Sequence, residues 1–170
     1  MKSLLEVFEE KRNLGQLNKS FVTGNQKFTL TLRRWNEKKL NQITDDMHYE
    51  VFRSISCLDC GNCCKSIPPM VNDTDVKRIA KQLKMKANDF KTAFTAVDED
   101  GDTVMNQTPC PFLGADNYCS IYEVRPKACR EYPHTGDLNF WKNSRLHADN
   151  AAVCPAVYHI LERLKGVKFN

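Results

Sequence analysis

Eight cysteines constrain this chain of 170 residues more than any other feature. Four of them fall in one run, Cys57-Leu58-Asp59-Cys60-Gly61-Asn62-Cys63-Cys64, and the others follow at Cys110, Cys119, Cys129 and Cys154. Thiolates are soft ligands that select zinc, copper(I) and iron–sulfur clusters. Two residues between successive cysteines let neighbouring side chains converge on one centre. The pattern therefore predicts that all eight sulfurs are metal ligands.

The expected cell compartment also favours metal binding over disulfides. Charged residues follow Met1 to Leu5 at once, beginning with Glu6, and this is not the pattern of a secretory signal peptide. No apolar run is long enough to span a bilayer. We therefore expect a cytoplasmic protein that does not act in a membrane, in a compartment where thiols are kept reduced.

Size and charge limit the remaining function classes. With 41% hydrophobic residues, the chain can bury one sizeable core. The net charge is only +4, and the densest basic stretch, Arg33-Arg34 with Lys38-Lys39, has the spacing of a solvated helix face. We therefore expect no nucleic-acid partner.

The first 56 residues are predicted to be helical. Leu4 and Phe8 mark a short amphipathic helix, and a longer apolar series from Phe28 to Val51 predicts one helix over about 26 to 53. Gly61 and the following Pro68-Pro69 are incompatible with a continuing helix. The first four sulfurs are therefore expected on a loop.

Downstream of that loop, the sequence predicts short elements. Asn72, Asp73 or Thr74 can cap one helix and Asn88 another, and turn residues between 98 and 121 predict one or two short strands or a hairpin. Short helices are expected to begin near Arg125-Pro126 and after Cys154-Pro155, because proline suits the first turn of a helix.

Together these elements predict a mainly α fold with a small irregular, short-strand, cysteine-rich half. The expected organisation is a helical segment over 1–56 and a cysteine-cluster metal-binding region over 57–170. Both belong to a single compact metal-stabilised domain in this interpretation, because ligands far apart in sequence close long loops when they bind metal.

Spacing leaves the metal and the grouping of the ligands open. Cys57, Cys60 and Cys63 have the C-x2-C-x2-C spacing of bacterial ferredoxins, whereas Cys64 adjoins Cys63 and is expected to point elsewhere. The eight thiolates could form two four-coordinate zinc sites, or one quartet could hold an iron–sulfur cluster while the rest bind zinc or remain thiols. His134 is a less favoured candidate ligand.

The order of these motifs resembles the CxxCxxCC family of zinc- or iron-chelating, YkgJ-like cysteine-cluster proteins. The resemblance covers about 57 to 154 and is carried by Cys57-x2-Cys60-Gly61-x-Cys63-Cys64, Cys110-Pro111-Phe112-Leu113 and Cys119-x-Ile121-Tyr122-x2-Arg125-Pro126-x2-Cys129-Arg130-x-Tyr132-Pro133. It implies a bacterial protein whose cysteines bind zinc or iron, and similar clusters occur in flagellin lysine methylases. The family name describes ligands rather than a reaction.

Arg125 and Arg130 are the candidate site residues that are not cysteines. Guanidinium groups beside Cys129 can donate hydrogen bonds to thiolates and offset their charge, which tunes a bound metal. The alternative is a helix packed through the aliphatic stems of both arginines, with their charges in water.

Three functional hypotheses follow. The first is a zinc- or iron-binding protein whose further biochemical role the sequence does not specify. The second is an iron–sulfur redox or protein-modifying enzyme. The third is an adaptor in which the metal shapes a surface for a protein partner, and it expects Phe112, Tyr118 and Tyr122 to be exposed.

Overall fold

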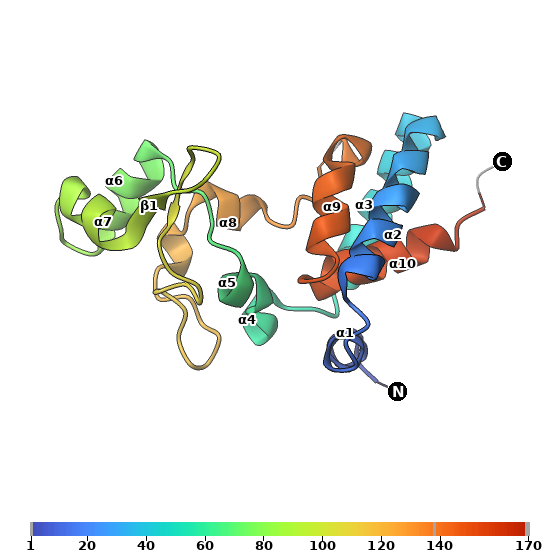
Figure 1. The fold of residues 1–170 in the computed structure, drawn as a ribbon, viewed down its shortest axis with the longest axis horizontal. Coiled ribbons are helices and arrows are strands. Elements are labelled where there is room, and N and C mark those ends of the chain that lie inside the picture. The colour runs from blue at the N-terminus through green and yellow to red at the C-terminus, as the bar shows by residue number, and fades with distance from the viewer. Residues whose placement is uncertain (1, 138, 169–170) are drawn as a thin grey trace. The chain divides into compact units, whose positions relative to one another are not determined.

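Helices account for most of the chain in the computed structural model, which describes residues 2–137 and 139–168 (Figure 1). Two short strands form one sheet. The prediction of a mainly α fold with little strand is therefore confirmed. Of the helices in the described part, none is both long and apolar enough to cross a membrane.

The chain divides into two units, which we describe separately. Unit 1 is Met1–Cys60 with Pro133–Asn170, and unit 2 is Gly61–Tyr132. This division does not test the predicted organisation into 1–56 and 57–170, which stays a prediction.

Unit 1 is a cluster of helices around one apolar core. Its longer helices are α1 (Leu4–Asn13), α2 (Lys19–Thr31), α3 (Glu37–Phe52), α9 (Ser144–Asn150) and α10 (Pro155–Lys165). Two short 3-10 helices accompany them, η1 (Leu32–Arg34) and η3 (Phe140–Asn143). Helix α2 packs on α9 and α3 on α10. The core they share includes Leu40, Val51, Phe140, Ile160 and Leu161, all buried.

The predicted single helix over about 26 to 53 is wrong. Helix α2 ends at Thr31, and Trp35 then takes an extended conformation with φ −86° and ψ 153°. Asn36 caps α3, because its side chain accepts a hydrogen bond from the backbone N–H of Lys39 at 2.9 Å. The apolar periodicity runs across the break because residues on both sides of it pack into the same core.

Unit 2 combines short helices with the sheet. Its elements are α5 (Asn62–Ser66), α6 (Asp73–Gln82), α7 (Ala87–Phe94), β1 (Thr95–Val97), β2 (Thr103–Met105), the 3-10 helix η2 (Tyr122–Val124) and α8 (Lys127–Glu131). The strands are antiparallel with Ala96 opposite Val104, so a short hairpin is present, beginning slightly before the predicted range. Ile79, Phe90 and Phe112 lie in the separate core of this unit.

Of the two caps predicted in unit 2, the cap of α6 is confirmed and the cap of α7 is wrong. Asn72 caps α6 as predicted: its side chain accepts from the Asp75 N–H at 2.8 Å, and the Asp75 carboxylate accepts from the Asn72 N–H at 3.2 Å. Asn88 does not cap α7, because that helix begins at Ala87 with Lys86 in the cap position. Ala87 packs against the core, which draws the first turn inward.

Candidate metal centre

The first cysteine run lies on two short helices, so its predicted loop is wrong. Helix α4 (Cys57–Cys60) belongs to unit 1, and α5 carries Cys63 and Cys64 in unit 2. Gly61 separates the two helices in the left-handed conformation with φ 62°. Glycine therefore ends one helical turn and starts another here, rather than preventing helix formation.

Four cysteines of unit 2 form one electrostatically interacting group: Cys64, Cys110, Cys119 and Cys129. Burial raises the pKa of the Cys129 thiol to about 12, and Cys64, Cys110 and Cys119 act in the same direction. Burial also raises the pKa of Cys110 and of Cys119, again with a contribution from Cys64. We call this set the four-cysteine group. Its members come from positions spread over most of unit 2.

The backbone holds three of these cysteines in defined places. The Cys110 N–H donates to the carbonyl oxygen of Cys64 at 2.8 Å, which ties two distant segments together. Cys119 pairs with Leu113 in an antiparallel bridge. Cys110 and Cys119 also pack against the core of unit 2. Their convergence thus follows from hydrogen bonds and packing that do not depend on the sulfurs.

Cys64 is the member of the group that loses its proton most readily. Its pKa is lowered to about 7, first by a hydrogen bond with Cys63, while burial opposes the shift and Lys65 adds to it. The two sulfur atoms, Cys63 Sγ and Cys64 Sγ, lie 4.0 Å apart. A thiolate, rather than a thiol, is the form that ligates metals, so Cys64 is prepared for that role.

A second set of sulfurs lies in unit 1. Burial raises the pKa of Cys154 to about 12, and Cys57 and Cys60 both add to this shift. Cys154 occupies the cap position of α10, and the backbone of Val157 and Ala156 opposes the effect of burial on its pKa. We call Cys57, Cys60 and Cys154 the three-cysteine group.

The donor chemistry of the four-cysteine group fits a soft metal ion. All of its donors are sulfur, and all eight cysteines of the chain are free of disulfides. Four thiolates form the tetrahedral all-sulfur set that zinc takes in structural sites, and iron–sulfur clusters use the same set. Across residues 2–137 and 139–168, no three His, Cys, Asp or Glu side chains already meet in the arrangement of a metal site. Closing the group around an ion would therefore require movement of its side chains.

Arg125 and Arg130 differ in their relation to the sulfurs. Arg125 opposes the effect of burial on the pKa of both Cys119 and Cys129, so its charge acts on the four-cysteine group. Its guanidinium stacks 3.8 Å from the centre of the Tyr122 ring and donates to the Tyr122 carbonyl oxygen at 2.6 Å. Arg130 donates instead to the carbonyl oxygen of Arg125 at 2.8 Å.

Two other predictions concern residues near the cysteine motifs. His134, the less favoured candidate ligand, pairs with Asp137 at 3.4 Å. Among the aromatic residues of the adaptor hypothesis, Phe112 is buried, Tyr122 is partly buried and Tyr118 is exposed. The surface that this hypothesis expects is therefore only partly present.

The sequence does not predict the link between α6 and the segment that carries Cys129. Asp75 is 1% exposed, and its carboxylate accepts a hydrogen bond from the Lys127 backbone N–H. Arg78 was not singled out, yet it donates to the backbone of Val124 and Arg125. The only signal in the sequence was the Asn72–Asp75 cap spacing, which accounts for the local contact alone.

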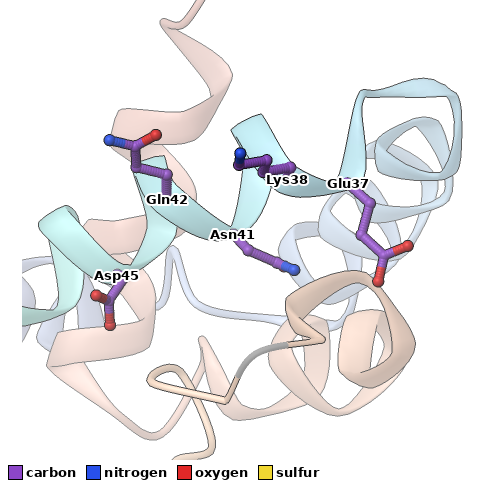
Figure 2. A pocket seen from close by; sticks show the side chains of 5 residues that line it. All are labelled: Glu37, Lys38, Asn41, Gln42 and Asp45. Carbon is purple, nitrogen blue, oxygen red and sulfur yellow. The ribbon is translucent and has the colours of Figure 1, made fainter.

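A surface hollow on α3 contains none of the predicted ligands. It is lined by polar side chains of that helix, which Figure 2 shows: Glu37, Lys38, Asn41, Gln42 and Asp45. These side chains come from a single helix and most of them are exposed to solvent, so they do not form an enclosed ligand site. The cysteine groups remain the candidate functional centre.

Comparison with known proteins identifies one family. The family model CxxCxxCC, described as "Putative zinc- or iron-chelating domain", matches residues 56–155. No curated protein and no solved structure gives a significant match to the chain. The matched range includes all eight cysteines, so the resemblance seen in the sequence is confirmed.

Proposed function

This chain belongs to the CxxCxxCC family, and from that premise we propose that it binds zinc or iron through Cys64, Cys110, Cys119 and Cys129. The assignment is supported by the hydrogen bond from the Cys110 N–H to the Cys64 carbonyl oxygen and by the packing of Cys110 and Cys119 on one core of unit 2. The pKa shifts of Cys110, Cys119 and Cys129, to which the other members of the group contribute, agree with it. When bound, the metal would neutralise thiolate charge and cross-link the segments that carry its ligands.

The chain itself supplies the conditions for such binding. Cys64 provides a thiolate near neutral pH, whereas Cys129 must lose a proton that burial retains, so metal uptake is expected to release protons. Arg125 then offsets part of the negative charge that collects around Cys119 and Cys129. We assign Arg125 this charge-balancing role, and Arg130 the role of holding the Arg125 backbone.

The three-cysteine group is proposed as a separate set of ligands. Cys57 and Cys60 contribute to the raised pKa of Cys154, and all three belong to unit 1, whereas the four-cysteine group belongs to unit 2. Cys63 keeps its predicted role as a ligand and is assigned to neither group. Free thiols in this number suit a reducing compartment, so we retain a cytoplasmic location as part of the proposal.

Metal and sulfide analysis of three proteins tests this assignment. The full chain, Cys129→Ser and Cys154→Ser are purified without oxygen, and zinc, iron and acid-labile sulfide are measured per chain. Cys129→Ser should lose the metal of the four-cysteine group and keep any metal bound by the other set, whereas Cys154→Ser should show the reverse. Wild-type protein without metal, or Cys129→Ser with the full wild-type content, would contradict the proposal.

The same analysis addresses the enzyme alternative. Zinc without sulfide supports a chelating or structural centre. Iron with a matching amount of sulfide, together with an absorption band near 400 nm, would instead favour the iron–sulfur redox or protein-modifying enzyme.

A further inference from the structure

Asp75 and Arg78 join helix α6 to the segment that carries Cys129. The Asp75 carboxylate is 1% exposed, and its Oδ1 atom accepts from the Lys127 backbone N–H at 3.1 Å. The same oxygen accepts from Arg78 Nη2 at 2.5 Å. A buried charge is costly unless it is paired and hydrogen-bonded, and this one is both. Every group involved lies in unit 2.

Asp75 supplies a cap that α8 lacks in its own sequence. Helix α8 begins at Lys127, and its cap position is Pro126, which provides no side-chain cap hydrogen bond. The first N–H groups of a helix have no partner within the helix, so an outside acceptor is needed. The Asp75 carboxylate fills this role for Lys127, and its negative charge suits the positive end of the helix.

Arg78 holds the turn that leads into α8. Its Nε donates to the Val124 carbonyl oxygen at 3.2 Å, and its Nη2 donates to the Arg125 carbonyl oxygen at 2.8 Å. A guanidinium can bridge a carboxylate and two carbonyl groups at once because its donors lie in one rigid plane. Arg78 thus fixes the turn through the carbonyl groups of Val124 and Arg125, the two residues that precede Pro126.

We infer that Asp75 and Arg78 are positioning residues that hold Cys129, and with it Arg125, in place for the four-cysteine group. Cys129 lies in the short helix that Asp75 caps, and Arg125 lies in the turn that Arg78 holds. A helix of five residues has little stability of its own, so its placement depends on such outside contacts. The inference rests on the proposed function, because it assigns a metal-related role to both residues.

The test measures how zinc protects Cys129 from alkylation. The full chain is incubated with iodoacetamide at buffered free-zinc concentrations, and mass spectrometry reports each cysteine separately. The midpoint is the free-zinc concentration at which half of Cys129 is protected. In Arg78→Met this midpoint should rise about ten- to hundred-fold, the usual loss of affinity when a residue that orients a ligand is removed. Asp75→Asn should shift it less, because the amide oxygen can still accept from Lys127.

Two controls separate positioning from general loosening. Asp73→Asn removes an exposed carboxylate from the same helix turn, where it pairs with Lys91 at 2.7 Å, and should leave the Cys129 midpoint unchanged. The alkylation rate of Cys154 reports on unit 1 and should be the same in all variants. In metal-free protein, amide exchange over Lys127–Glu131 should speed up in Arg78→Met and Asp75→Asn but not in Asp73→Asn.

The failures of the two proposals are distinguishable. If zinc does not protect Cys129 in the wild-type chain, the proposed function fails and the inference fails with it. If wild-type Cys129 is protected and its midpoint stays within about twofold in both Arg78→Met and Asp75→Asn, only the inference is overturned. The inference would also be overturned if the alkylation rate of Cys154 rose in these variants as much as that of Cys129, because the effect would then be global.

Discussion

The Asp75 side chain accepts a hydrogen bond from the backbone N–H of Lys127, 52 residues further along the chain. The same carboxylate closes the capping box of α6 with Asn72. One buried acid therefore makes capping contacts in two helices, of which the second carries Cys129. Replacing Asp75 should therefore affect α8, which is distant from Asp75 in the sequence.

Replacement of Asp75 by alanine is expected to lower the local stability of unit 2 by about 3 kcal/mol, because it breaks a buried charged pair and removes one capping contact from each of α6 and α8. The effect should be measured as amide exchange of α6 and α8 in metal-free protein. Tryptophan fluorescence would miss it, since both tryptophans, Trp35 and Trp141, lie in unit 1. Unchanged exchange at Lys127 in Asp75→Ala would show that the cap contributes nothing.

Replacement of Gly61 by alanine is expected to destabilise the chain by about 1–3 kcal/mol, because Gly61 has a left-handed backbone. The added Cβ would also lie 3.1 Å from Asn117 Oδ1. Gly24→Ala is the matched control: it lies within α2 with open space around it, and should stabilise by about 0.5–1 kcal/mol. Urea unfolding followed by circular dichroism should show a lower free energy of unfolding for Gly61→Ala and a higher one for Gly24→Ala than for the wild type.

The buried His147 is expected to make unit 1 less stable in acid. Burial lowers its pKa to about 3, with a contribution from His134, whereas an unfolded histidine titrates near pH 6.5. Between these values the unfolded chain binds a proton that the folded chain does not, so stability falls as pH falls from about 6.5 towards 3. By pH 5 the loss should be about 2 kcal/mol.

His147→Phe tests this prediction, because a phenylalanine keeps the stack on Phe140, whose ring centre lies 4.1 Å from that of His147. It also removes two ring nitrogens that are buried in the core of unit 1. The variant should show a smaller loss of stability between pH 7 and pH 5, measured by urea unfolding with Trp141 fluorescence. The pKa values of His48 and His159 are also lowered by burial, so the free energy of unfolding of the variant should still decrease somewhat as the pH falls. An identical slope in wild type and variant would contradict the assignment.

Phe90→Ala is expected to open the core beneath the four-cysteine group. Phe90 is fully buried and packs against Phe94 and Phe112, with ring centres 5.3 and 6.3 Å away. Truncation of a buried phenylalanine costs about 3–5 kcal/mol. Cys110 and Cys119 pack on this core, so both should be alkylated faster in the metal-free variant. Leu83→Ala, at a half-exposed position next to α6, should leave both rates near wild type.

The sequence by itself determined the family and several local elements, and it predicted sulfur ligands. Asn72 could be predicted to cap α6 because the capping contacts join residues only three apart. The hairpin and the start of α10 at Pro155 were predictable from equally local signals. The break between α2 and α3 was not, because residues on either side of Trp35 bury apolar side chains in one core and keep the periodicity intact.

Only the tertiary structure decided how the sulfurs are grouped and what holds them. Cys64 interacts with Cys110, Cys119 and Cys129 because the Cys64 carbonyl pairs with the Cys110 N–H, and Cys110 and Cys119 pack on one core. Spacing along the sequence describes neighbours within a few residues, whereas these contacts join segments separated by dozens of residues. The link from Asp75 to Lys127 has the same character: a carboxylate's partner depends on which backbone the fold brings beside it.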